Sequence, residues 1–408
     1  MLGPLLSVRT LLIAIFMLMA GSGFLSTLIA VRLELAGASA VTIGVVGTAY
    51  FAGLMAGSLR VPALIGRIGH IRAFAACVTV FSASGLAYAL LRDPIWWSAL
   101  RFMDGVAMAG VFVCLESWLN RQAAPQSRSM ILAAYMVCLY GGQAAGQFLL
   151  NIGQNQPDLP FMLSAIILSL ALLPVLLTRL DQPQVETIVP FSLRRLYDAS
   201  PLGIAGVILN GTMLGAFYAL GSVYVQRLGM SLSQVALFTS CVIAGGVALQ
   251  TPLGLLSDRF DRRRVIIFCF LAVIAICATM AFAPLPRIAL FALGALFGGF
   301  AFALYPLCVA HSNDHLAEEE RLGASSGLVL AYSAGAVSGP MLASLSMTAF
   351  GAPGLFILIG ALAAIGGGFG IWRLLVAEPV EAEDQQAFRG LPRTSPMVAV
   401  LEAEAEQE

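Results

Sequence analysis

Apolar runs long enough to cross a bilayer dominate this sequence. A helix needs about 20 mainly apolar residues to cross about 30 Å of hydrocarbon. Twelve such runs lie near residues 8–30, 41–63, 72–91, 94–118, 129–151, 158–178, 200–225, 232–256, 264–283, 286–310, 322–348 and 352–375. Hydrophobic residues make up 59% of the 408 residues, more than a soluble domain of this length can bury. The sequence therefore predicts an all-α membrane protein with twelve transmembrane helices.

The arginines predict which ends of these helices face the cytoplasm. If both termini are cytoplasmic, seventeen arginines fall in inside segments and four in outside segments, and Arg101 lies within the membrane. Cytoplasmic loops generally carry this excess of basic residues. The first apolar run extends beyond the length of a signal-peptide core, so we interpret it as a spanning helix. We expect both termini in the cytoplasm.

The chain is expected to consist of two similar halves. The longest polar interruption, 179–199, predicts a cytoplasmic linker between six-helix bundles at 1–178 and 200–375. A shift of 192 residues overlays 32–72 on 224–264 without a gap, and a shift of 193 places two glycines of the fifth run on two of the eleventh. Parallel six-helix repeats are typical of one large class of transporters. The acidic tail, 376–408, is expected to be disordered.

Two loops and one span carry motifs with a recognisable pattern. GLLSDRFDRRRV at 254–265 resembles the signature loop of the major facilitator superfamily, and PALIGRIGHIR at 62–72 is its first-half counterpart, with Gly66 in place of the acid. Arg101-Phe-Met-Asp104-Gly105 resembles the fourth-span motif, with Asp104 in place of the more usual glutamine. ESWLN at 116–120 and YPLCVAHSND at 305–314 further resemble the YcaD-like branch of bacterial inner-membrane members.

This resemblance implies a twelve-helix transporter fold that works by alternating access. The central cavity would be lined chiefly by spans 1, 4, 7 and 10. The family's gating loop maps onto Arg67, Gly254, Asp258, Arg259 and Arg262. The alternative is that both loops only anchor the cytoplasmic face. GGQAAGQ at 141–147 has Gln147 where proton-driven exporters carry proline, which weakens an exporter interpretation.

Three ionisable residues, Arg101, Asp104 and Glu116, lie in the fourth run. At 100° per residue they share one helical face, and charges within a membrane normally face the bundle interior or a water-filled cavity. Arg101 and Asp104, at i and i+3, can form a structural ion pair. Alternatively, the carboxylate titrates and couples proton movement to substrate binding. Glu116 either gates the cytoplasmic end or caps the signature loop. All three are candidates for proton coupling.

Polar and aromatic residues within the apolar runs are the candidates for the substrate cavity. Isolated small polar residues in membrane helices more often pack helices together than bind ligands. Aromatic and amide side chains together suit an organic solute of modest polarity. The candidates are Thr27, Met108, Phe112, Tyr140, Gln143, Gln147, Asn210, Phe217, Tyr218, Tyr305 and Tyr332.

The leading hypothesis is a secondary active transporter, coupled to protons, that moves a small organic solute across a bacterial inner membrane. Export and uptake both stay open, as does a sensor or assembly factor without turnover. The three histidines lie near cytoplasmic ends, which argues against an enzyme. The sequence has no phosphate-binding loop, no cofactor motif and no clustered metal ligands, so a copper importer is disfavoured. The zero net charge indicates no nucleic-acid partner, and we expect a monomer in the bilayer.

Overall fold

The computed structural model describes residues 3–123, 127–154, 156–178, 183 and 192–376, and tail positions 385, 386, 388, 390, 393 and 394. Over these residues, twelve helices are long and apolar enough to cross a membrane, which confirms the predicted number. The first half contains α1 (Gly3–Ser22), α2 (Leu25–Leu35), α3 (Ala40–Ile68), α4 (His70–Leu90), α5 (Pro94–Gln122), α6 (Arg128–Gln147), the 3-10 helix η2 (Phe148–Gln154) and α7 (Leu159–Leu176).

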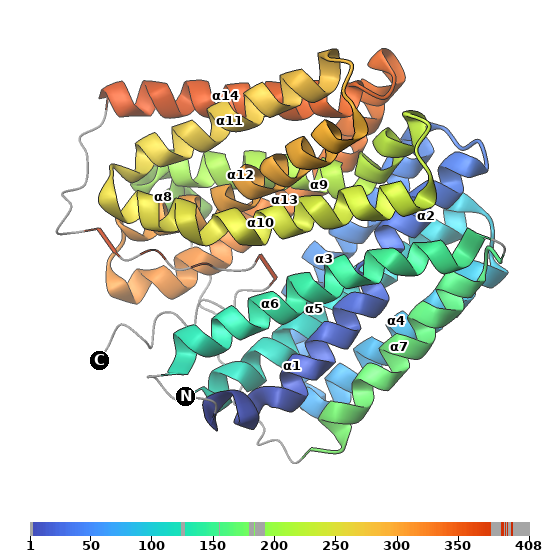
Figure 1. Cartoon of the computed structure of the whole chain (residues 1–408). Helices are drawn as coiled ribbons and strands as arrows, with labels where there is room; N and C mark the ends of the chain where they lie inside the picture. The colour runs from blue at the N-terminus through green and yellow to red at the C-terminus, as the bar shows by residue number, and fades with distance from the viewer. Residues whose placement is uncertain are drawn as a thin grey trace.

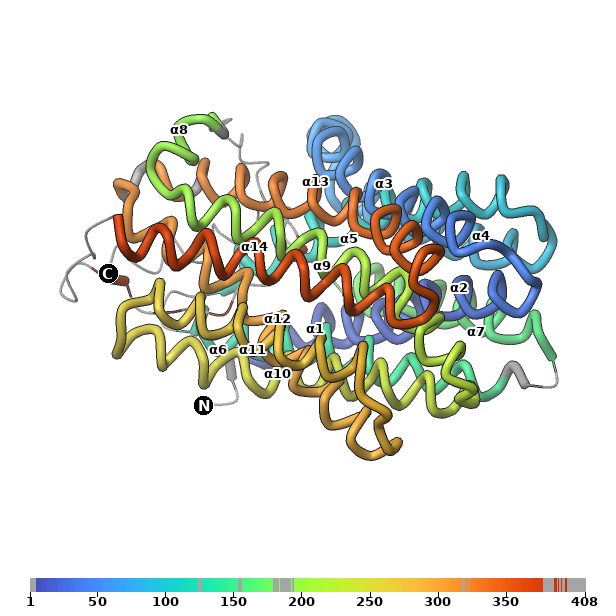
Figure 2. Tube along the Cα trace, turned by 90° about the horizontal axis from the view of Figure 1, so that it is seen from above, coloured from blue at the N-terminus to red at the C-terminus, as the bar shows by residue number. Residues whose placement is uncertain are grey.

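The second half begins after the short helix α8 (Leu193–Ala199). It contains α9 (Pro201–Arg227), α10 (Leu232–Arg259), α11 (Arg262–Phe282), α12 (Arg287–Asn313), α13 (Glu318–Phe350) and α14 (Gly354–Val376). Figure 1 shows α1–α7 gathered in one half and α9–α14 in the other. In both views α1 begins and α14 ends at the same end of the molecule (Figures 1 and 2). We call it the arginine-rich end, because it holds the loops around Arg67 and Arg262, and the other is the far end.

Two of the twelve spans are broken rather than continuous. The first consists of α1 and α2, which meet at Gly23 and Phe24, and the fifth consists of α6 and η2. Hydrocarbon offers no hydrogen-bond partner to a backbone group that a break releases, so the protein must supply one. The side-chain amide of Gln147 donates a hydrogen bond of 3.0 Å to the carbonyl oxygen of Gly23. A side chain of the broken fifth span therefore supplies the hydrogen bond that the break in the first span leaves unmade.

Glycines bring neighbouring helices into close backbone contact, and they do so at equivalent places in both halves. A Cβ atom at Gly53 of α3 would collide with the backbone oxygen of Phe102 in α5. A Cβ atom at Gly245 of α10 would collide in the same way with Ala295 in α12. Small residues allow this approach in membrane proteins, where packing rather than hydrophobic burial drives helix association. Gly53 and Gly245 are matched by the 192-residue shift, so the packing follows the predicted repeat.

The two halves are joined to each other at the far end. The hydroxyl of Thr48 in α3 donates to the carbonyl oxygen of Val337 in α13 over 3.2 Å. At the last turns of α9 and α2, Arg227 forms a bidentate ion pair with Glu34, with N–O distances of 2.7 and 2.9 Å. These contacts close the far end.

We expect Gly142→Ala to lower stability by about 1–3 kcal/mol, the usual cost of overpacking. Its Cβ atom would collide with the backbone oxygen of Phe16 in α1. Gly141→Ala is the matched control, because a Cβ atom there meets only a ring atom of Phe16 at 3.9 Å. Thermal unfolding of both purified variants in detergent checks this. Equal losses in the two variants would contradict the packing described here.

We also expect Glu34→Arg to loosen the far end. A well-aligned bidentate pair near the surface contributes about 1 kcal/mol, which corresponds to about fivefold faster opening. Hydrogen exchange of α2 and α9, followed by mass spectrometry, measures this opening. The reciprocal variant Glu34→Arg/Arg227→Glu should restore slow exchange. Slow exchange in the single variant would show that the pair does not hold this end closed.

Candidate functional site

A cavity of about 840 Å³ lies between the two halves. Both halves contribute side chains to it, and six of the predicted candidates line it: Met108, Phe112, Tyr140, Gln143, Tyr218 and Tyr332. The other lining residues are Met19, Ser22, Gly23, Ser26, Tyr50, Phe51, Leu54, Phe81, Arg101, Leu139, Arg393 and Thr394. The wall is thus mainly aromatic and apolar, with one amide and few charges, as is usual for pockets that bind small organic molecules.

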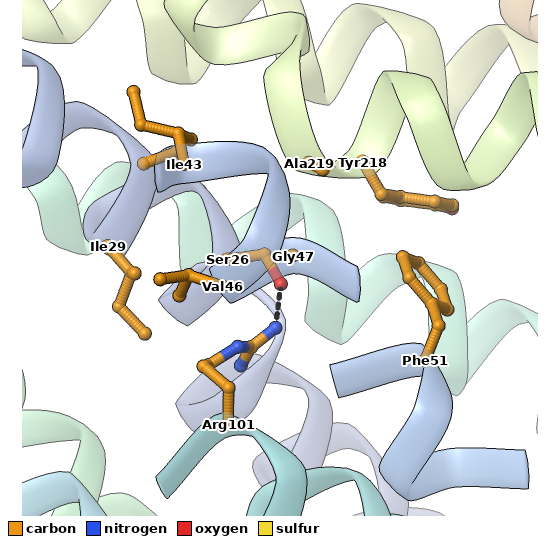
Figure 3. Close-up of a pocket in the computed structure, with 10 residues that line it drawn as sticks. Ser26, Ile29, Ile43, Val46, Gly47, Phe51, Arg101, Tyr218 and Ala219 are labelled. Carbon is orange, nitrogen blue, oxygen red and sulfur yellow. Dashed lines mark hydrogen bonds between the residues drawn. The ribbon is translucent and has the colours of Figure 1, made fainter. Parts of the chain in front are cut away.

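Arg101 lies in the wall of this cavity with only 3% of its surface exposed. Its Nη2 donates a hydrogen bond of 2.5 Å to the hydroxyl of Ser26 in α2 (Figure 3). Its guanidinium carbon lies 4.1 Å from the centre of the Tyr50 ring, a cation–π contact. The guanidinium is therefore held by α2 and α3 as well as by its own helix.

A smaller space of about 290 Å³ lies on the far-end side of Arg101. Figure 3 shows its lining, which includes Ile29 and Ile43. Ser26, Phe51, Arg101 and Tyr218 line both this space and the larger cavity. These four residues consequently lie between the two spaces, and they come from both halves of the protein.

Asp104 is fully buried but points away from the cavity lining. The hydroxyl of Tyr88 donates to its carboxylate over 2.6 Å, and the hydroxyl of Ser84 donates to the other carboxylate oxygen. Nη1 of Arg101 lies 3.7 Å from this carboxylate. The helical projection placed Asp104 on the cavity face, whereas the structure turns it toward α4, where the two hydroxyls stabilise its charge.

Glu116 is also fully buried, about three turns closer to the arginine-rich end than Asp104. The hydroxyl of Tyr135 in α6 donates to its carboxylate over 2.7 Å, and so does the hydroxyl of Thr394 in the tail. Because Thr394 lines the cavity, Glu116 lies immediately behind the cavity wall. These two hydrogen bonds link Glu116 to α6 and to the tail.

Five predicted cavity residues lie outside the lining in this conformation. The amide of Gln147 is engaged with the broken first span, as described above, and Thr27 is buried in α2. Asn210 donates to the carbonyl oxygen of Ala301 over 2.7 Å, so it links α9 to α12. Phe217 and Tyr305 are buried among other aromatic rings. A polar or aromatic residue within an apolar span indicated a position with a specific role. For these five residues, that role is contact between helices rather than lining of the cavity.

The predicted gating loop lies at the arginine-rich end and is built around Arg262. Arg262 is buried and forms ion pairs with Asp314 over 2.6 Å and with Asp258 over 3.1 Å. Burial raises the pKa of Asp314, although the Arg262 guanidinium opposes this shift. Arg67 and Arg259, by contrast, are exposed. The second-half loop thus contains an ion-pair network around the buried Arg262, and the first-half loop carries an exposed arginine.

The described tail residues reach this loop and then the cavity, which the sequence did not indicate. The backbone N–H of Phe388 donates to Asp258 over 2.8 Å, and the ring of Phe388 fills the space beside Gly254. Beyond it, Arg393 and Thr394 line the cavity. The rest of the predicted disordered tail lies outside the described residues. Ser26, Tyr50 and Phe51 were also missed, because in the sequence they are ordinary members of apolar spans.

Comparison with known proteins places these features in context. The sequence profile of the Major Facilitator Superfamily matches residues 11–246 and 202–402. The MFS-type transporter YcaD of Escherichia fergusonii is 33% identical over 331 residues, which cover 79% of this chain and 84% of that protein. Among solved structures, the nucleoside transporter NupG aligns with a TM-score of 0.73 at 14% identity, over 90% of this chain and 99% of that one.

A bacterial homologue of the human lysosomal transporter Spinster, in an inward-facing and occupied conformation, aligns with a TM-score of 0.71 at 16% identity. This alignment covers 93% of this chain and 98% of the other. At such identities the two solved structures indicate a shared fold and no more.

We expect Asp104→Asn to lower stability by about 3 kcal/mol, because it leaves the buried charge of Arg101 without its counter-ion. The Oδ1 atom of asparagine can accept a hydrogen bond from one of the two hydroxyls, and its Nδ2 atom can donate to the other, so the change mainly removes the charge. Thermal unfolding of the single variant and of Arg101→Gln/Asp104→Asn in detergent checks this. The double variant, which removes both charges, should be the more stable of the two. A double variant that is less stable would mean that Asp104 does not serve Arg101 as a counter-ion.

Proposed function

The chain belongs to the major facilitator superfamily, and we propose that it is a secondary active transporter that moves a small organic solute by alternating access, coupled to protons. The position of Arg101 carries this proposal. It lies where two spaces meet, one toward each end of the molecule, beside Phe51 and Tyr218 from the two halves. A solute in the larger cavity would contact both halves at once, so its binding energy can act on their relative positions.

The Arg101–Asp104 contact offers a route for proton coupling. The partners of Asp104 differ in what they can do when the carboxylate is protonated. The hydroxyls of Ser84 and Tyr88 can donate or accept, so they satisfy either form of the carboxyl group, whereas a guanidinium only donates. Protonation would therefore weaken the contact with Arg101 selectively and leave the guanidinium to its cavity partners. Glu116 is a second candidate, because its carboxylate lies just behind the cavity wall beside Tyr135.

We propose further that the arginine-rich end faces the cytoplasm and that the protein acts as a monomer in a bacterial inner membrane. The excess of arginine at this end and the bacterial source of the similar transporters support this orientation and location. With this orientation, the far end is periplasmic. The Asp258–Arg262–Asp314 network and Arg67 then lie at the cytoplasmic entrance, where a gate would act.

Flux measurements in proteoliposomes test this proposal. Solutes that stabilise the purified protein in a thermal-shift screen are loaded with and without a pH gradient. We expect a gradient of one sign to accelerate flux and the opposite sign to slow it, which also reveals export or uptake. Arg101→Gln should lower flux more than about tenfold, because losing a buried charge contact exceeds the ~1.4 kcal/mol that this factor represents.

The outcomes separate the remaining alternatives. Flux that is independent of the pH gradient would exclude proton coupling but would still support the transport proposal. If stabilising solutes are found and none of them crosses the membrane, a sensor or assembly factor would replace the transporter proposal. Arg264→Gln, at an exposed arginine of α11, is the control for loss of a positive charge.

A further inference from the structure

Four aromatic side chains lie around one position at the wall of the larger cavity, and the three tyrosines among them line it. They are Tyr140 of α6, Tyr218 of α9, Phe302 of α12 and Tyr332 of α13, and they come from both halves of the protein. The Phe302 ring centre lies 5.8 Å from that of Tyr140 and 6.2 Å from that of Tyr218. We call these four residues the aromatic cage. Ring faces are electron-rich, so such a cage is suited to a cation.

The protein's own Arg393 occupies this cage. Its guanidinium carbon lies 4.4 Å from the ring centre of Phe302 and 5.6 Å from that of Tyr332. The tyrosine side chains of Tyr140 and Tyr332 also interact favourably with the guanidinium. Its Nη1 is buried without a hydrogen-bond partner, so the guanidinium is held by the rings of Phe302 and Tyr332 and by tyrosine hydroxyls rather than by a full set of acceptors. The cage therefore accommodates an organic cation of guanidinium size.

The charges buried in α5 favour a cation at this position. Arg101 is positive, while Asp104 and Glu116 are acidic, so with both carboxylates ionised the three carry one net negative charge. Arg101 is close to Asp104, and the tail residue next to Arg393 donates a hydrogen bond to Glu116. Arg393 is thus the neighbour in sequence of a residue that contacts the second carboxylate. A cation that replaced Arg393 would keep a positive charge in this acidic surrounding.

Contacts with the gating loop determine the point at which the tail approaches the cavity. Nη2 of Arg262 donates to the backbone oxygen of Gln386 over 2.6 Å, and the backbone N–H of Gln386 donates to Asp314 over 3.1 Å. With Phe388 bound at Asp258, this attachment lies only a few residues before Arg393. A short tether of this kind gives Arg393 a high effective concentration at the cage.

We infer that the aromatic cage is the binding site for an organic cation, a guanidinium or alkylated ammonium with an apolar body, and that Arg393 fills it as an intramolecular competitor. The inference rests on the proposed transport function only in taking this cation to be the transported solute. A competitor within the chain lowers the apparent affinity for a free ligand by the fraction of molecules in which the site is occupied. Replacing Arg393 should therefore raise the apparent affinity of the aromatic cage for a free cation.

Titration calorimetry of the full-length purified protein tests the inference, with n-butylguanidinium as the probe and N-butylurea as its neutral analogue of similar shape. We expect Arg393→Gln to bind n-butylguanidinium at least about tenfold more tightly than the unmodified chain. Arg393→Lys, which keeps a cation on the tail, and Arg264→Gln should both resemble the unmodified chain. N-butylurea should bind to none of them.

A second variant locates the bound probe. Phe302→Leu, combined with Arg393→Gln, should lose the gained affinity while its thermal midpoint shows that it remains folded. Equal affinities of the unmodified chain and Arg393→Gln would overturn the inference, as would equal binding of urea and guanidinium. So would undiminished binding when Phe302 is replaced.

Flux of the same probe distinguishes this inference from the proposed function. If Arg393→Gln binds n-butylguanidinium but proteoliposomes move neither it nor any stabilising solute, the cation site stands and the transport proposal fails. If the variant transports another solute and does not bind the probe, transport stands and the cation site is refuted.

Discussion

Burial of charge in hydrocarbon is the constraint on which the rest of this structure depends. An ionised side chain within a membrane costs several kcal/mol unless the protein or enclosed water satisfies it. Arg101 is satisfied by Ser26, by the ring of Tyr50 and by the nearby carboxylate of Asp104. These partners come from α2, α3 and α5, so one guanidinium connects three spans. The same requirement places Arg101 at the cavity between the halves.

Close helix packing makes each half a firm support for this site. Backbone contacts at Gly53 and at its repeat partner Gly245 join α3 to α5 and α10 to α12. Between the halves, the contacts at the far end include hydrogen bonds and one ion pair close to the surface. Alternating access requires the contacts between the halves, most extensive between α3 and α13, to break while the packing within each half persists, so that whole halves move without repacking their interiors.

The sequence predicted the fold well and the site only in part, for physical reasons. Twelve spans and their repeat follow from hydropathy and glycine spacing, which depend little on tertiary detail. The direction of a side chain depends on its neighbours, so Asp104 lies toward Ser84 and Tyr88 rather than the cavity. Tyr50 carries no signal that separates a cavity residue from a packing residue. Arg393 could not be placed because its partners are distant in sequence and its own segment is polar.

Reciprocal opening of the two ends is the central claim, and spin-label distance measurements test it most directly. One pair of labels at Arg67 and Arg259 reports on the arginine-rich end, and a pair at Ala36 and Leu228 reports on the far end, all exposed positions. In lipid nanodiscs at pH 5 and pH 8, we predict two populations for each pair, with the arginine-rich end shortening as the far end lengthens. Distances that stay fixed, or that change together at both ends, would contradict alternating access in this protein.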